Sequence, residues 1–508
     1  MTRPGVGRSG LPHPGQNPDI RLIVWQEGQA TVLRGIKGWA RRLGPVHALA
    51  VLVLLQLWLI AAHSPWRDEL QAYLLVRDSP GLSGLFANLH YEGHPGVWYL
   101  VLALVRIAVG SARALTAAQV VIALGTTALV WRRAPFADWL KLLILAGYYP
   151  LFEYGVIARS YGLGALLLFA WLALRRGGWG WLILAVMANI AVNFALLSAF
   201  CVAAGLWIER RWSWAGAALW AAGCLAAVIT IIPAHDVQTG LSALAQPLAA
   251  RVLAALRWQS AALYPAMVGV WPYRWQVLVS PPEAPWPAAM LGLAAGGLIA
   301  LAVRREPKAS VLTLGLFLVL AALSALIYPT YPRHVGVLVL FGVGLEWIRT
   351  EARDEPASPL FVAWTGLLAA CGLWAAVCAL AIPFSAGRQE ARWIADHHLE
   401  RAAWAAYPGY AGSDISAYFD RPTYNLQKQC LDTFIRWNAH AYDDVDDDVL
   451  ADRIEDPGPF DYLVSDEDLG PLDDPMHLVA HFDRGSGDND LFIYAMDRPK
   501  AGAALACR

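Results

Sequence analysis

PVHALAVLVLLQLWLIAAHSPWRDELQAY, residues 45–73, joins an apolar run directly to a charged one. The first seventeen or so residues after Pro45 are typical of a membrane-spanning helix, and Arg67, Asp68 and Glu69 stand where the chain would leave the bilayer. Two interpretations are open. The adjacent carboxylates could carry chemistry at the membrane surface, or they could be the solvated start of a surface helix, because charges beside membrane spans are common.

Composition indicates the broad class. Of 508 residues, 57% are hydrophobic and 16% are charged, and 24 are Trp, which is unlike a soluble domain. We therefore expect an α-helical polytopic membrane protein that lies in a lipid bilayer. The formal net charge of -1 makes nucleic acid an unfavourable partner. The six cysteines lack a paired spacing and argue for neither a zinc site nor a secure disulfide.

The positive-inside rule predicts the orientation. Residues 1–43 read as a cytoplasmic leader, and its basic residues precede a first span at about 46–62. The loop 63–95 is then periplasmic, and its apolar spacing predicts two short amphipathic helices on the outer surface.

Further apolar segments give a transmembrane domain over 44–383 with about 11–13 helices, and a second long outer loop at 233–285. One conflict stays open. Two full crossings within 97–131 would return the chain to the outside, whereas Arg132 and Arg133 mark the inside; either one segment does not cross or the basic pair misleads.

Residues 384–508 have ordinary soluble character. Helical and strand-like pieces alternate, which predicts a small α/β domain, with strand-like runs that include 402–407, 433–437, 461–464, 478–482 and 491–495. The acidic run 443–448 reads as a solvated loop, since it lacks the glycine and terminal glutamate of an EF-hand loop.

Several outer-loop residues suit chemistry on a lipid-anchored substrate. Asp68 can take a proton from an attacking hydroxyl or amine, and a divalent metal ion at Glu92 and His94 is the one cofactor that the pattern suggests. Arg159 and Arg333 can neutralise a phosphate, with His334 assisting. The alternatives are purely structural roles: Arg159 anchors a helix end at the membrane interface, and His94, before Pro95, only starts a helix.

These motifs together resemble the GT-C superfamily of integral membrane glycosyltransferases. The resemblance rests on the Asp68-Glu69 pair, the run Tyr91-Glu-Gly-His-Pro95, and Ala158-Arg-Ser-Tyr161. The nearest branches are the bacterial ArnT-like and RgtA/B-like enzymes, with protein O-mannosyltransferases more distant. Gly96 replaces the second proline of the usual His-Pro-Pro run.

The resemblance implies a polyprenyl-phosphate sugar as donor, a periplasmic active site, inversion at the anomeric carbon and a bacterial inner-membrane location. It makes Asp68 the catalytic base and Glu92 an acidic residue that helps to bind a metal or the donor phosphate. Arg159 and Tyr161 match its Arg-x-Tyr element. Substrate-binding residues are then Glu69, Arg159, Tyr161, Arg333 and His334, and the tentative metal ligands are Glu92 and His94.

The resulting expectation is an inverting glycosyltransferase that moves a sugar to a glycolipid, polysaccharide or protein acceptor. A secondary transporter or lipid flippase, a non-catalytic membrane scaffold and a polysaccharide polymerase or ligase remain as alternatives. A transporter should show an inverted repeat and ionisable residues near mid-span, and neither is evident in the sequence.

Overall fold

The structure is a computed structural model of the whole chain. It describes residues 44–237, 246–266, 268–271, 273–275, 285–438, 445–455, 458–470, 476–498, 500–502 and 504–507. The proposed leader 1–43 therefore lies outside the described residues, and so do residues 443 and 444 of the acidic run. The chain divides into Met1–Val51 and Leu52–Arg508, and all contacts discussed below lie within the second unit.

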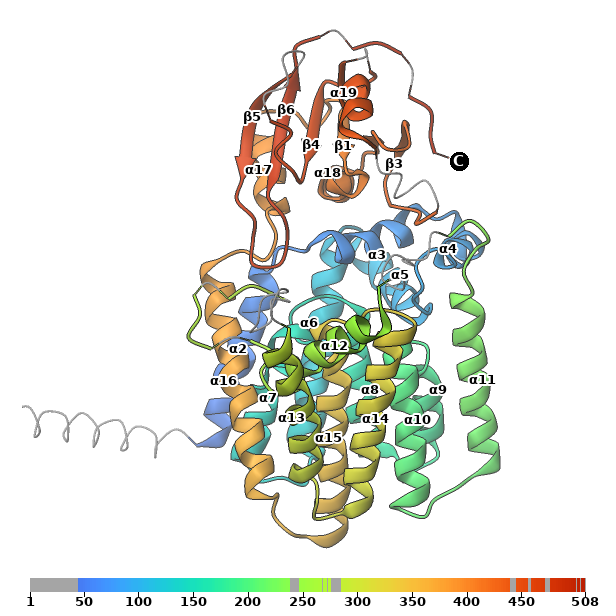
Figure 1. Cartoon of the computed structure of the whole chain (residues 1–508), viewed down its shortest axis with the longest axis vertical. Helices are drawn as coiled ribbons and strands as arrows, with labels where there is room; N and C mark the ends of the chain where they lie inside the picture. Colours follow the sequence, from blue (N-terminus) through green and yellow to red (C-terminus); the bar gives the residue numbers. More distant parts are fainter. Residues whose placement is uncertain are drawn as a thin grey trace, which may run out of the picture. The chain divides into compact units, whose positions relative to one another are not determined.

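Helices dominate the first three quarters of the chain (Figure 1). In chain order they are α2 (Pro45–Ala62), α3 (Arg67–Asp78), α4 (Gly81–Leu89), α5 (Val97–Val109), α6 (Arg113–Arg133), α7 (Asp138–Leu145), the π-helix η1 (Tyr149–Glu153), α8 (Ser160–Leu174), α9 (Trp179–Met187), α10 (Val192–Trp207), α11 (Trp214–Ile231), α12 (Leu248–Gln259), the short η3 (Ser260–Ala262), α13 (Trp286–Ala302), α14 (Pro307–Leu326), α15 (Pro332–Arg353) and α16 (Pro359–Ala381). The predicted apolar segments and the two amphipathic helices of the first loop are confirmed as helices.

Among the described residues, five helices are long and apolar enough to cross a bilayer: α2, α6, α11, α14 and α16. The apolar helices α5, α8, α10 and α13 are shorter. Helix α15 is different, since it is buried over almost its whole length and packs against α8, α10 and α14. A helix that is surrounded in this way forms the centre of the bundle.

Basic residues from several helices meet at one end of the bundle, here called the basic end. Arg175 after α8 pairs with Glu351 of α15 at 2.5 Å, and Arg353 pairs with Glu306 before α14 at 2.8 Å. At the opposite end, called the sheet end, lie the starts of α8 and α15 and a C-terminal sheet (Figure 1).

The structure resolves the conflict in residues 97–131. Helices α6 and α8 run parallel, because Gln119 of α6 donates to the Tyr154 carbonyl just before α8 and Gly125 faces Leu166 further along. Helix α6 therefore starts at the sheet end and ends at the basic end with Arg132 and Arg133. Helix α5 has 13 residues, starts against α3 and ends just before α6, so both of its ends lie at the sheet end and it does not cross the bundle.

The C-terminal region, here called the sheet domain, contains a six-stranded mixed sheet of order β3-β2-β1-β4-β6-β5. Its strands are β1 (Trp404–Tyr407), β2 (Thr423–Asn425), β3 (Cys430–Asp432), β4 (Tyr462–Ser465), β5 (Met476–Phe482) and β6 (Leu491–Met496), and its helices are α17 (Gly387–Asp396), η4 (Gly409–Gly412), α18 (Ser413–Phe419) and α19 (Asp447–Glu455). Strand β1 pairs in parallel with β2 and β4, and β6 is antiparallel to β4 and β5.

Apolar clusters cover the two faces of this sheet. One contains Leu463, Phe460 and Ile454, and the other contains Val464, Ile493 and Ile394. Adjacent strand residues Leu463 and Val464 point to opposite faces, as the two-residue period of a strand requires. The predicted α/β region is thus confirmed.

One prediction for this region is wrong, and the structure adds a disulfide that the cysteine spacing left open. Residues 433–437 are not a strand; the strand ends at Asp432, and residues 433–438, here called the 433–438 segment, leave the sheet. Cys430 and Cys507 form a disulfide across 77 residues of sequence. The spacing of the cysteines does not indicate this disulfide, because the end of the chain returns beside β3 only in the folded protein. There the amide of Cys507 donates to the Leu431 carbonyl.

Polar contacts hold the sheet domain against the first loop. Arg388 of α17 donates to the His63 carbonyl at 2.7 Å, and Arg77 of α3 donates to the Ser416 carbonyl of α18 at 2.7 Å. Between α17 and α18, Glu390 and Asp414 are both buried, and neither oxygen of Glu390 has a hydrogen-bond partner. Burial raises the pKa of Glu390 and of Asp414, since two carboxylates cannot both stay charged there.

Candidate active site

The start of α3 fixes the orientation of its first turn. Glu69 Oε2 accepts a hydrogen bond from the Trp66 amide at 3.1 Å and lies 2.8 Å from His63 Nε2, and Glu69 Oε1 accepts from the Ala158 amide at 2.6 Å. These bonds cap the helix and tie it to the segment that carries Arg159. The fully buried Glu69 does not line the neighbouring cavity, so we assign it a structural position in place of the predicted substrate contact.

A cavity of about 800 Å³ opens beside that turn. It lies at the sheet end, and its walls come from α3, the loop 90–96, the starts of α8, α10 and α15, the ends of α11 and α14, and the sheet domain. Seven of the predicted site residues share this lining: Asp68, Glu92, His94, Arg159, Tyr161, Arg333 and His334. Their positions in the sequence span 267 residues, so the helix bundle alone brings them together.

Asp68 and Arg159 form an ion pair in this cavity. Arg159 Nη1 donates to Asp68 Oδ2 at 2.7 Å, and the two side chains are 13% and 30% exposed. Burial alone would raise the pKa of Asp68, but the guanidinium groups of Arg159, Arg333 and Arg67 together hold it below its usual value. Asp68 is therefore ionised at neutral pH.

Arg333 is one of three arginines in the cavity lining, with Arg67 and Arg159. Its guanidinium lies 4.9 Å from the ring centre of Tyr331 and 5.6 Å from that of Trp275. Within the described part of the chain it has no carboxylate within 4.0 Å, and its buried Nε has no hydrogen-bond partner. Beside it, His334 Nδ1 accepts from the Tyr331 amide, which leaves Nε2 for another partner.

Glu92 and His94 form the opposite part of the lining. Glu92 Oε1 accepts from Gln71 Nε2 at 2.7 Å and Oε2 accepts from the Tyr99 hydroxyl at 3.4 Å, while His94 Nδ1 lies 2.9 Å from the Glu92 carbonyl. Burial raises the pKa of Glu92 to about 7 and lowers the pKa of His94 to about 4. Both groups thus favour their neutral forms.

These contacts do not favour a metal ion. Both oxygens of Glu92 are already hydrogen-bonded, and no group of three His, Cys, Asp or Glu ligands is formed by the described lining residues. Glu153 does not add a ligand, because it is buried outside the lining and accepts from Tyr148 and Trp275. We therefore derive no step through a metal.

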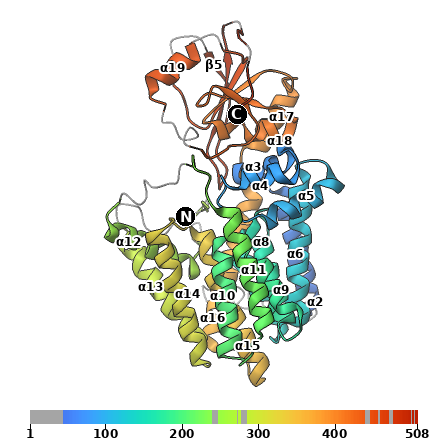
Figure 2. The same ribbon diagram turned by 90° about the vertical axis from the view of Figure 1, so that its right-hand side faces the viewer.

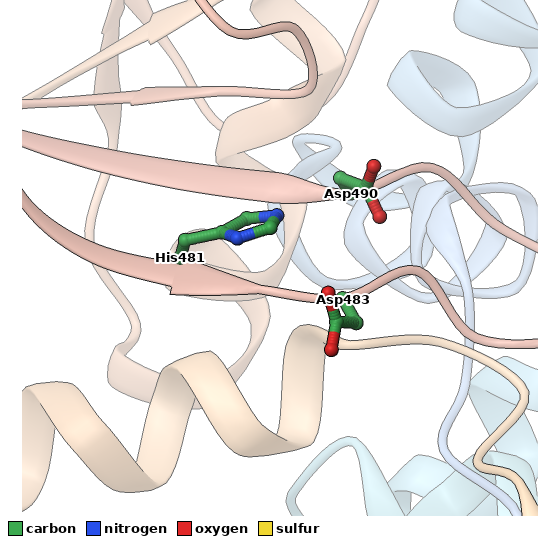
Figure 3. Close-up of side chains that lie close together, drawn as sticks. All are labelled: His481, Asp483 and Asp490. Carbon is green, nitrogen blue, oxygen red and sulfur yellow. The ribbon is translucent and has the colours of Figure 1, made fainter.

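One group with metal-ligand spacing lies in the sheet domain instead. His481 lies in β5, Asp483 directly follows that strand, and Asp490 lies just before β6, with their ligand atoms within 4.8 Å of one another (Figure 3). His481 also stacks on Phe492, and Asp490 accepts from the Arg484 amide. The three residues are not part of the cavity lining, so they do not replace the predicted pair.

The sheet domain closes one side of the cavity with Tyr410, Ser413, Ile435 and Trp437. The 433–438 segment is held there by Gln71, whose Nε2 donates to the Ile435 carbonyl at 2.6 Å and whose Oε1 accepts from the Ile435 amide at 2.9 Å. The sequence analysis missed Gln71. Gln71 follows Asp68 by three residues, which places the two side chains on one helix face. This spacing could have identified Gln71 as a residue of the same site.

An apolar flank forms another side. Ile231, Leu323 and Ile327 line the cavity at the ends of α11 and α14, and α10 lies between these two helices (Figure 2). Ile327 is also 68% exposed, so the cavity wall continues into the apolar outer surface of the bundle. Asn193, which the sequence showed only as a polar residue in an apolar segment, lies in the lining beside this flank.

No family model, curated protein or solved structure matches this chain. The resemblance to the GT-C superfamily therefore rests on the quoted motifs, and function has to be argued from the cavity itself.

Proposed function

We propose that this chain is an inverting membrane glycosyltransferase of the GT-C type, which moves a sugar from a polyprenyl-phosphate donor to a lipid, polysaccharide or protein acceptor. One observation carries the proposal: a single cavity combines the carboxylate of Asp68, the guanidinium groups of Arg159 and Arg333, and an apolar flank. A base, an anion site and an apolar surface are what this reaction requires.

The chemistry assigns a role to each group. Asp68 takes the proton of the acceptor hydroxyl or amine, whose lone pair attacks the anomeric carbon of the donor sugar. The bond between that carbon and the phosphate oxygen breaks, and its electron pair leaves with the polyprenyl phosphate. Arg333 and Arg159 stabilise the negative charge on the leaving phosphate, because guanidinium groups match phosphate in charge and geometry.

The apolar flank suits a lipid-linked donor. A polyprenyl chain would lie along α11 and α14, where Leu225, Ile229 and Leu318 are at least half exposed. The phosphate would then reach Arg333 at the depth of the lipid head groups. A freely soluble donor would need no such surface.

Two observations support an extracytoplasmic site. The disulfide of Cys430 and Cys507 belongs to the sheet domain, and disulfides persist in oxidising compartments. The basic residues gather at the opposite end of the bundle, as the positive-inside rule requires of a cytoplasmic end. Together they favour an extracytoplasmic sheet end; the resemblance to the GT-C superfamily adds the periplasm and the bacterial inner membrane to this proposal.

A transporter or flippase is the rival of another class. It would need a pathway that reaches both membrane faces in turn, with ionisable residues along it. The cavity lining comes from the helix ends at the sheet end. A scaffold would not require a carboxylate and two guanidinium groups to face one cavity, so the geometry favours transfer chemistry.

The test is transfer of radiolabelled sugar from a panel of polyprenyl-phosphate sugars to membrane or polysaccharide acceptors. Asp68→Asn should lose most of the activity, about 100-fold or more, because general-base catalysis is worth about 10²–10⁴-fold. Asp138→Asn is the matched control, since Asp138 is half exposed and pairs only with Lys141 on the same helix. Undiminished transfer by Asp68→Asn would reject the assigned base, and no transfer by the wild type would reject the function.

A further inference from the structure

The state of Arg159 raises a question about the same cavity. The hydrogen bond of its guanidinium goes to Asp68 at 2.7 Å, and its carbon lies 5.7 Å from the Trp66 ring centre and 5.5 Å from that of Tyr161. These rings are close enough for cation–π contacts with the guanidinium, which help to hold it beside Asp68 in the cavity lining. The group that would help to bind a phosphate is thus also the partner of the base.

A base in such a pair is a poor proton acceptor. Each proton that Asp68 took would break its ion pair with Arg159, and the paired carboxylate is held in its charged form. The reaction therefore needs an event that separates the two groups.

Another arginine of the cavity shows what that event could be. Arg333 faces the same cavity with no carboxylate partner among the residues described, and nine-tenths of it is buried. An entering phosphate is attracted first to this unpaired guanidinium. The phosphodiester of a lipid-linked sugar carries one negative charge on two non-bridging oxygens, so with one oxygen at Arg333 the other can accept from Arg159 in competition with Asp68.

We propose that Arg159 is shared between Asp68 and the phosphate of the lipid-linked substrate, so that binding of the phosphate releases Asp68 and makes it the base. This inference rests on the proposed function and adds an order to it: the donor binds before the acceptor loses its proton. Once Arg159 turns to the phosphate, Asp68 loses the guanidinium that lowers its pKa most, so that pKa rises from its depressed value. The carboxylate becomes basic only when a sugar is present to receive the attack.

The sharing makes an unusual prediction for binding. Asp68→Asn removes the competitor for Arg159, so it should bind phosphate more tightly although it transfers no sugar. We expect farnesyl phosphate, titrated into the purified full-length protein at pH 7 and low salt, to bind about 10- to 150-fold more tightly, the range for a hydrogen bond to a charged group. Inorganic phosphate should show the same tightening at a weaker affinity, because the competition concerns the phosphate alone.

Two controls separate sharing from a general loss of negative charge. Asp420→Asn removes an exposed carboxylate that pairs with Arg77 at 2.5 Å outside the cavity lining, and it should change the affinity by less than about twofold. In an Arg159→Gln background the effect of Asp68→Asn should disappear, since the two groups act as one pair. Asp68→Ser serves as a second variant if Asp68→Asn fails to fold.

The outcomes separate this inference from the proposed function. Three results would overturn the sharing. Asp68→Asn could bind phosphate equally or more weakly than the wild type, the tighter binding could survive in the Arg159→Gln background, or it could occur with farnesyl phosphate and not with inorganic phosphate. If Asp68→Asn binds phosphate more tightly but the wild-type protein transfers no sugar from any donor, the proposed glycosyltransferase function is overturned and the sharing remains. No binding of farnesyl phosphate by any variant would overturn both.

Discussion

The attachment of the 433–438 segment to the cavity should depend on one side chain, Gln71. Its amide makes three hydrogen bonds, two with the peptide groups of Ile435 and one with Glu92. Gln71 is 7% exposed and Ile435 is 5% exposed, so water does not replace these bonds easily. The substitution Gln71→Met keeps the length of the side chain and removes all three bonds.

The cost follows from what is left unpaired. The Ile435 amide and carbonyl would both lose their partner, at about 1–3 kcal/mol for each buried group. Partial entry of water reduces the sum, and about 2–4 kcal/mol of local destabilisation remains. Since about 1.4 kcal/mol corresponds to a factor of ten, local opening of the segment should become about 30- to 1000-fold more frequent.

Hydrogen exchange measures this opening on the full-length protein, through a peptide that covers residues 430–438. The matched control is Gln56→Met, because Gln56 is also 7% exposed and donates to the Pro150 and Leu151 carbonyls, far along the chain from the segment. Unchanged protection in Gln71→Met, or equal loss in both variants, would show that other contacts hold the segment and that Gln71 does not.

Three further outcomes follow from packing, cross-linking and charge. Gly292→Ala would place a methyl group 1.8 Å from the Leu256 carbonyl oxygen and should cost more than about 2 kcal/mol, whereas Gly297→Ala on the same helix meets open space and should be neutral in a thermal unfolding assay. Cys430→Ser with Cys507→Ser should destabilise the sheet domain by about 2–4 kcal/mol, seen as proteolysis at lower temperature than in the wild type. Burial raises the pKa of Glu390 in the folded chain, so the stability that its neutral form contributes is present at acidic pH and is lost as pH rises through that pKa. Glu390→Gln should therefore raise the melting temperature at pH 8 and leave it nearly unchanged at pH 5. An equal effect at both pH values would contradict this sign.

The sequence predicted the helical segments well because their signal is local. The first span, for example, was predicted at about 46–62, and helix α2 covers Pro45–Ala62. The strand at 491–495 was found by the same means. The 433–437 run was predicted wrongly because its side chains suit a strand while its peptide groups bond to Gln71. No local pattern records that partner.

Candidate site residues were found one by one, since charged groups next to apolar segments are conspicuous. Asp68, Arg159 and Arg333 all line the cavity. Glu69 was misjudged, because a carboxylate that caps its own helix and one that faces a substrate have the same appearance in a sequence.

The sequence by itself determined that this chain is helical, apolar enough to enter a bilayer, and followed by a small α/β region, because hydropathy and side-chain period depend on neighbouring residues only. Tertiary structure alone decided that α5 does not cross the bundle, that Cys430 meets Cys507, and that Arg159 pairs with Asp68. Each of these depends on residues brought together from distant parts of the chain. Such contacts are chosen by packing of whole helices and strands, which local sequence does not encode.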